Sequence, residues 1–262
     1  MDLDLRGKVA LVTGGTSGIG RAISTALLDE GCEVYAADIN LSAAQGAPEF
    51  AGATAHLVRM DVGDPKGVQQ AVDAILVERG RIDILVNCAG ILKTRSVVES
   101  TIADWDDVAR VNLSGVYYCS KAVLPAMIAQ RYGKIINIAS VASAKGGGQF
   151  GNVLYGTTKA GVVAMTQGFA RELGPYGINV NVIYPGQTIT EATLERYAEQ
   201  ARREGTTVEA LRKAVDERTV LKHVVTATDI GYVVAMLCSP LAIGVHGEAI
   251  GVDGGNRADM HY

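Results

Sequence analysis

The feature that most constrains the fold of this chain is a regular alternation of short β-branched segments with longer segments of helical periodicity. The predicted strands are 9–13, 33–37, 55–60, 82–87, 134–140, 179–184 and 249–252. The predicted helices are 18–30, 65–79, 103–130, 152–173 and 228–238. Several strands are apolar on both faces, as parallel strands covered by helices on both sides are. We therefore expect an α/β fold with a doubly wound, parallel, seven-stranded sheet.

Two segments interrupt this alternation without marking a domain boundary, so residues 1–262 are predicted to form a single domain. Residues 143–151 are too rich in glycine for a helix or strand and are predicted to form a mobile loop. Residues 191–218 contain thirteen charged residues and two apolar stripes separated by Gly205. A Thr206-x-x-Glu209 capping box predicts the start of a second helix. We expect 187–222 to be a helical lid between strands six and seven that closes over a substrate. The alternative is a fixed pair of surface helices on the sheet edge.

The charge balance excludes several classes of protein. The chain has 24 Lys and Arg against 28 Asp and Glu, a formal net charge of −4. Proteins that bind nucleic acid or anionic lipid present a basic surface, so neither partner is expected. No apolar run approaches the roughly 20 residues that cross a bilayer. Residues 1–6 contain acids where a signal peptide has positive charge, which predicts a cytoplasmic protein.

The cysteines and histidines predict neither disulfides nor a metal site. No C-x-x-C pair is present, and no two histidines are spaced i, i+4. Each of the four cysteines lies in apolar sequence, where a buried, reduced side chain is the ordinary outcome. The cysteines are Cys32, Cys88, Cys119 and Cys238.

A glycine-rich turn follows the first predicted strand and opens into a helix, with the sequence Thr-Gly-Gly-Thr-Ser-Gly-Ile-Gly at 13–20. Such a turn lets the backbone approach a pyrophosphate at the helix N-terminus. Alone it could be a plain strand-to-helix turn. However, Asp38 ends the second strand 18 residues after Gly20, where a carboxylate accepts hydrogen bonds from a ribose and repels a 2′-phosphate. The pattern predicts a Rossmann-type site for NAD. It is not an ATP-binding P-loop, because Arg21-Ala22 follows the last glycine.

A second group of residues predicts proton transfer. Tyr155 and Lys159 are four residues apart at the start of a predicted helix, so they share a face. A free phenol titrates near pH 10, and a neighbouring cation favours the phenolate. Taken alone, such a pair is more often structural. Ser140 ends a buried strand at the edge where open α/β sheets bind ligands, and Asn112 places an amide in an apolar helix.

Together these motifs resemble the short-chain dehydrogenase/reductase family, in its single-domain branch of about 250 residues. The resemblance spans 5–255. It rests on T-G-x3-G-x-G at 13–20, Asp61-Val62, Asn-Cys-Ala-Gly at 87–90, Asn112, Ser140, Tyr155-x3-Lys159, Pro185-Gly186 and Asp-Gly-Gly at 253–255.

The resemblance assigns the catalytic roles. Tyr155 is expected to be the general acid/base and Ser140 to hydrogen-bond the substrate oxygen. Lys159 is expected to bind the nicotinamide ribose and tune the phenol, and Asn112 to hold a water in the proton relay. The family also assembles as homotetramers through the helices corresponding to 103–130 and 152–173, which implies a homotetramer here.

The resemblance likewise implies the cofactor contacts, with Asp61 and Val62 at the adenine and Thr190 at the carboxamide. The full set is Gly14, Thr16, Ser17, Gly18, Ile19, Gly20, Asp38, Asp61, Val62, Asn87, Ala89, Gly90, Tyr155, Lys159, Pro185, Gly186, Thr188 and Thr190. Two features depart from the common pattern. The interval from Ser140 to Tyr155 is two residues longer, with the excess at 146–148, and the residues after Tyr155 are Gly-Thr-Thr.

The substrate is predicted only by class. Candidate contacts are Arg95, Gln149, Asn152 and Gln187, with Leu92, Ser143, Tyr184, Leu194 and Tyr197 as further pocket candidates. Their amides and arginine favour a small polar secondary alcohol, interconverted with its ketone by an NAD(H)-dependent oxidoreductase. One alternative is an NADPH-dependent reductase of the 3-oxoacyl-carrier-protein type, which would prefer a neutral or basic residue in place of Asp38. A remote alternative is a non-catalytic dinucleotide-binding protein.

Overall fold

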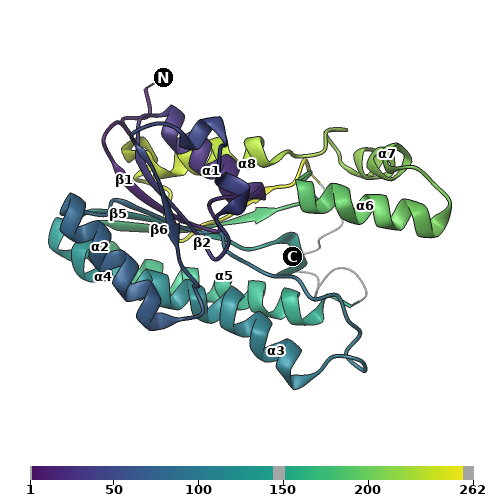
Figure 1. Ribbon diagram of the computed structural model, residues 1–262. Coiled ribbons are helices and arrows are strands. Elements are labelled where there is room, and N and C mark those ends of the chain that lie inside the picture. The colour runs from purple at the N-terminus through teal and green to yellow at the C-terminus, as the bar shows by residue number, and fades with distance from the viewer. Residues whose placement is uncertain (1, 144–150, 256–262) are drawn as a thin grey trace.

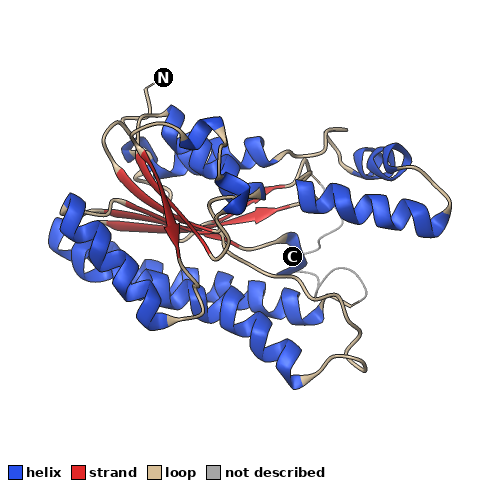
Figure 2. Cartoon of the chain, in the orientation of Figure 1, coloured by secondary structure: helices blue, strands red, loops and turns tan. Residues whose placement is uncertain are grey.

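The computed structural model describes residues 2–143 and 151–255, and its centre is one parallel sheet (Figures 1 and 2). The strand order is β3-β2-β1-β4-β5-β6-β7. The strands are β1 (Val9–Thr13), β2 (Glu33–Asp38), β3 (Ala55–Arg59), β4 (Ile84–Asn87), β5 (Gly133–Ile138), β6 (Ile178–Pro185) and β7 (Ala249–Val252). The predicted doubly wound, seven-stranded Rossmann fold is confirmed.

Helices cover both faces of this sheet, with α1 and α8 on one side and α2, α4 and α5 on the other (Figure 1). The helices are α1 (Gly18–Asp29), α2 (Pro65–Arg79), α3 (Ile102–Ala109), α4 (Gly115–Gln130), α5 (Val153–Leu173), α6 (Glu191–Glu204), α7 (Val208–Arg218) and α8 (Ala227–Cys238). A separate apolar core lies on each side of the sheet, which is why the inner strands are apolar on both faces. No helix in the described ranges is long and apolar enough to cross a membrane.

The strand order reverses between β1 and β4, and this point positions the site. From β1 the chain winds outward to β2 and β3, then returns to β4 on the opposite side of β1. The last residues of these two central strands, Thr13 and Asn87, are partners in register. Ligands of open α/β sheets bind beside such a reversal, at the carboxyl ends of the strands.

The predicted helix over 103–130 is wrong in one respect, because it is interrupted. A π-helical turn, Arg110–Ser114, lies between α3 and α4. Single π-turns within helices are common at functional sites. On this turn the side-chain amide of Asn112 hydrogen-bonds the backbone N–H and carbonyl of Ile91 on the neighbouring loop, a contact with a distant segment that helical periodicity does not encode.

Two strand boundaries differ from the prediction by two residues, and five others differ by one residue. The fourth strand starts at Ile84 rather than 82, because the side-chain amide of Gln130 binds both backbone groups of Ile82. The fifth strand ends at Ile138, so Ser140 lies two residues beyond the strand.

The insertion between β6 and β7 forms two helices, as predicted, and projects beyond the edge of the sheet (Figure 1). Gly205 ends α6 in the left-handed conformation, with φ 66°. The predicted capping residue is wrong by one position: Thr207, rather than Thr206, caps α7 by accepting from the backbone of Ala210. The two helices share a small apolar core of Tyr197, Val215 and Val224 with Ile189, Val208 and Leu211.

Candidate active site

The glycine turn brings the N-terminus of α1 to the strand-order reversal. Gly14 and Gly18 have positive φ, 63° and 52°, which favours glycine. A Cβ on Gly14 would stand 2.9 Å from Ala89 Cα, so the two backbones approach closely only because that position is glycine. Ser17, the N-cap of α1, makes no side-chain capping bond, and the first turn has no acid. The exposed N–H groups therefore suit an anion.

Thr13 is a positioning residue that the sequence interpretation did not assign. Its hydroxyl accepts from the backbone N–H groups of Cys88 and Ala89 at 3.1 and 3.2 Å, and it is 1% exposed. It therefore joins the turn after β1 to the turn after β4. The signal was present in the sequence, since this threonine is the first letter of the glycine motif.

Asp38 lies at the end of β2, as predicted, with its carboxylate held in place. Thr16 Oγ1 donates to one carboxylate oxygen at 2.8 Å, and the Asn40 backbone N–H donates to the other at 3.2 Å. Thr16 is fully buried within the glycine turn. The acid is thereby oriented by the same turn that would receive a pyrophosphate.

The first turns of α5 hold Tyr155 and Lys159 on one face. Lys159 Nζ lies 5.8 Å from the centroid of the Tyr155 ring and donates to the Ile138 carbonyl at 2.6 Å. Lys159 is 3% exposed, and this burial lowers its pKa to about 8. Thr158 Oγ1 donates to the Tyr155 carbonyl at 2.8 Å. The predicted pairing of a phenol with a cation is thus present in the structure.

Asn112 is fully buried on the π-turn and is anchored by three hydrogen bonds. Its Oδ1 accepts from Ile91 N at 2.8 Å, and its Nδ2 donates to Ile91 O at 2.9 Å and to Thr158 Oγ1 at 3.4 Å. A Cβ on Gly90 would lie 3.4 Å from Asn112 Oδ1 and 3.5 Å from Lys159 Nζ. Gly90 therefore lies next to both the Asn112 amide and the Lys159 ammonium.

Ser140 precedes a 3-10 helix, Val141–Ser143, that packs against α5. Its Oγ accepts from the backbone N–H of Ala142 at 3.2 Å, and its carbonyl accepts from the Ser143 hydroxyl at 2.6 Å. The structure thus places Ser140 at the same edge of the sheet as the start of α5. The longer interval that follows it, including 146–148, lies outside the described residues.

The remaining cofactor candidates lie along the same carboxyl edge. Asn87 donates to Ser120 and Asn137, while its buried Oδ1 has no hydrogen-bond partner among the described residues. Such an orphaned acceptor, together with the uncapped N-terminus of α1, fits a nicotinamide dinucleotide lying across this edge. Gly186 follows β6 and packs against Asp253: a Cβ there would lie 2.7 Å from Asp253 Cβ.

Two predicted threonines lie at the base of the insertion. Thr190 caps α6 and accepts from the Thr193 backbone N–H at 3.2 Å. Thr188 is 7% exposed and donates to the Gly186 carbonyl at 3.2 Å. The segment from Gly186 to α6 is therefore tied to itself by side-chain bonds, next to the glycine turn at Gly18.

The substrate candidates are only partly brought together. Asn152 precedes α5 and accepts from Thr94 Oγ1 at 3.4 Å, and the Arg95 backbone N–H bonds the Gly151 carbonyl. The loop with Arg95 therefore adjoins the helix of Tyr155. The Arg95 guanidinium is half exposed and lies 3.4 Å from Asp104. Gln187 is half buried, and Gln149 lies outside the described residues.

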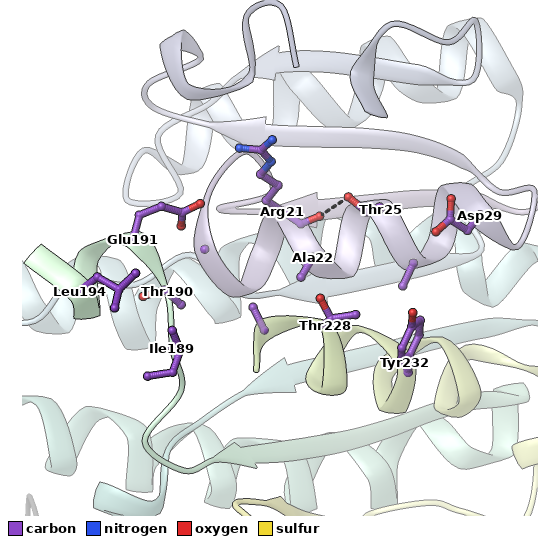
Figure 3. Close-up of a pocket in the computed structure, with 13 residues that line it drawn as sticks. Arg21, Ala22, Thr25, Asp29, Ile189, Thr190, Glu191, Leu194, Thr228 and Tyr232 are labelled. Atoms are coloured by element: carbon purple, nitrogen blue, oxygen red, sulfur yellow. Dashed lines mark hydrogen bonds between the residues drawn. The ribbon is translucent and has the colours of Figure 1, made fainter. Parts of the chain in front are cut away.

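A cavity of about 440 Å³ lies on the outer side of α1, between α8 and the start of α6 (Figure 3). Its lining includes Gly18 and Thr190, but none of the four predicted catalytic residues. The cavity therefore adjoins the base of the insertion between β6 and β7 rather than the predicted catalytic residues. Figure 3 shows Leu194 and Glu191 of α6 bordering it opposite Thr228 and Tyr232.

Comparison with known proteins decides the family. A family model described as enoyl-(acyl carrier protein) reductase matches residues 14–257. The chain belongs to the short-chain dehydrogenase/reductase family. Its members are oxidoreductases that bind a nicotinamide dinucleotide.

Relatives match over nearly the whole chain. The chain is 34% identical to the 3-oxoacyl-[acyl-carrier-protein] reductase FabG of Escherichia coli, over 97% of this chain and 98% of that protein. It is 36% identical to FabG of Aquifex aeolicus, over 97% and 99%. Among solved structures, L-sorbose reductase from Gluconobacter frateurii, complexed with NADPH and L-sorbose, has a TM-score of 0.92 at 26% identity, covering 99% and 100%. The family and fold predictions are confirmed, and the relatives' names favour the 3-oxoacyl alternative over a small polar substrate.

Proposed function

We propose that this protein is a ketoreductase that converts a 3-oxoacyl substrate to the corresponding secondary alcohol. The observation that supports the substrate class is the similarity to FabG proteins over 97% of the chain. The reaction class rests on the site, where the buried Lys159 ammonium and the anchored Asn112 amide both lie beside Gly90. The Tyr155 ring lies next to that ammonium. This constellation suits proton transfer to a carbonyl oxygen, and its completeness argues against a non-catalytic dinucleotide-binding protein.

The chain's own residues would act on the carbonyl oxygen. In the reducing direction the Tyr155 hydroxyl donates a proton to that oxygen, and Ser140 Oγ donates a hydrogen bond that holds it in place. The Lys159 ammonium favours the phenolate that remains, and Asn112 holds the π-turn beside it. A bound nicotinamide dinucleotide supplies the hydride for the carbonyl carbon.

The cofactor we propose is NAD(H). Asp38 stands at the ribose end of the predicted site, and Thr16 and Asn40 orient its carboxylate. The 2′-phosphate of NADP(H) would place a second anion next to the Asp38 carboxylate. Like charges close together repel, so this carboxylate disfavours NADP(H). The L-sorbose reductase structure contains NADPH, so NADP(H) is the competing outcome that the assay must separate.

A second candidate substrate is a small polar ketone such as a ketose. The likeness to L-sorbose reductase, at TM-score 0.92, favours it. The polar loop beside α5, with Thr94, Arg95 and Asn152, is compatible with hydroxyl groups near the entrance.

Oxidation of NADH and of NADPH, followed at 340 nm, tests these proposals. The substrates are acetoacetyl-CoA, as a 3-oxoacyl thioester, and L-sorbose, as a polar ketone. We expect the highest kcat/KM with acetoacetyl-CoA and NADH. A higher kcat/KM with L-sorbose would replace the 3-oxoacyl proposal, and equal or better use of NADPH would refute the cofactor proposal. Tyr155→Phe serves as the control, since any true turnover requires the phenol.

The cytoplasmic location and the homotetramer predicted from the sequence remain part of this proposal. Light scattering tests the assembly directly. A monomer of 27.5 kDa at micromolar concentration would contradict the homotetramer.

A further inference from the structure

An ion pair joins Asp61, the predicted adenine contact, to Arg110, a residue with no predicted role in catalysis or cofactor binding. Arg110, the first residue of the π-turn, places Nη1 3.1 and 2.9 Å from the two carboxylate oxygens of Asp61. Both side chains are partly exposed, at 45% and 34%. A surface pair of this kind contributes little to the stability of the fold, typically ~0–1 kcal/mol. We therefore consider a role for this pair in positioning rather than in stability.

The surroundings of the pair accommodate it specifically. A Cβ on Gly63 would collide with the Arg110 guanidinium, so the arginine lies directly over a glycine. At the far end of the π-turn, a Cβ on Gly115 would lie 2.8 Å from Val62 Cγ2. The segment 61–63 is therefore attached to both ends of the turn that holds Asn112.

The hydrogen bonds of Asp61 to the other described residues leave one acceptor position of its Oδ2 open. Its Oδ1 accepts from Gly63 N at 2.8 Å and from Arg110, whereas its Oδ2 accepts, among the residues that the structure describes, from Arg110 alone. A carboxylate offers about four acceptor positions, two on each oxygen, so Oδ2 retains room for one more donor. These bonds to Arg110 and Gly63 also lower the pKa of Asp61, against the effect of burial, which keeps the group an acceptor.

We propose that Arg110 is a positioning residue for cofactor binding: it orients Asp61 so that Oδ2 accepts from the exocyclic amino group of adenine. This inference rests on the proposed nicotinamide dinucleotide. Because the arginine also begins the π-turn, the adenine end of the cofactor and the segment with Asn112 are held as one unit. Hypoxanthine, which has a carbonyl in place of that amino group, places an acceptor against the carboxylate and is disfavoured.

The test measures binding by titration calorimetry with NAD and with nicotinamide hypoxanthine dinucleotide. We expect the wild type to prefer NAD by about tenfold, the effect of one hydrogen bond to a charged group. Arg110→Met should weaken NAD binding about three- to tenfold and reduce that preference, because Asp61 loses its fixed orientation. Arg110→Lys, which keeps the charge, should retain part of the NAD affinity and part of the preference for NAD that Arg110→Met loses.

Two controls separate this role from a structural one. In an Asp61→Asn background, Arg110→Met should cause no further loss of preference between the two dinucleotides. Arg171→Met, at an exposed arginine near the end of α5, should leave both affinities unchanged. Equal preference in the wild type and Arg110→Met would overturn the inference while leaving the proposed function intact. A wild type that binds neither dinucleotide would overturn both.

Discussion

We expect Lys159, the buried lysine of the site, to lower the stability of the folded protein, because its function requires a charged group in a buried position. Lys159 is 3% exposed, and burial lowers its pKa from 10.5 to about 8. Each pKa unit is worth ~1.4 kcal/mol, so keeping this ammonium charged in the folded protein costs about 3 kcal/mol at pH 7. Replacing it removes the cost but leaves the Ile138 carbonyl without its donor, a loss of ~1 kcal/mol. Lys159→Met should therefore be about 2 kcal/mol more stable than the wild type at pH 7.

The pH dependence provides the sharper signature. Below pH 8 the lysine is protonated in both the folded and the unfolded chain, and the full penalty applies. Between pH 8 and pH 10.5 the unfolded chain binds the proton and the folded chain does not, so wild-type stability rises with pH. The advantage of Lys159→Met should consequently shrink by about 2–3 kcal/mol from pH 7 to pH 10.

Guanidinium denaturation of both proteins without cofactor, at pH 7 and pH 10 and at one protein concentration, measures this difference. Lys66→Met, at an exposed lysine on α2, is the matched control and should change stability by less than about 0.5 kcal/mol at either pH. A less stable Lys159→Met at pH 7, or an advantage that is the same at both pH values, would refute the argument. The same variant should lose both cofactor affinity and kcat.

Three further predictions concern the acid/base, the cofactor and the lid. Tyr155→Phe should keep cofactor affinity and lose about 10²–10⁴-fold in kcat, and substantial turnover would contradict the assignment. Asp38→Asn should narrow the ratio of kcat/KM for NADH over NADPH by about tenfold, since the repulsive charge is removed, whereas an unchanged ratio would rule out that role. Residues 187–222 should gain protection from hydrogen exchange when NAD binds, and protection equal with and without NAD would favour fixed surface helices.

Much of this protein is determined locally in its sequence. The inner strands are apolar on both faces, so their burial between two helical layers could be predicted from the run of apolar residues in each strand. The positive φ of Gly14 and Gly18 and the left-handed end of α6 at Gly205 occur at glycine, the residue that adopts such backbone angles at the lowest cost. The pairing of Tyr155 with Lys159 follows from helical spacing.

The tertiary structure decided the features that depend on distant residues. The π-turn carries Asn112, whose side-chain partners lie on the loop at Ile91, 21 residues away in the chain. The bond between Arg110 and Asp61 spans 49 residues. Hydrophobic period and turn chemistry act over a few residues, whereas these contacts form only after the sheet has brought remote segments together, so no local pattern encodes them.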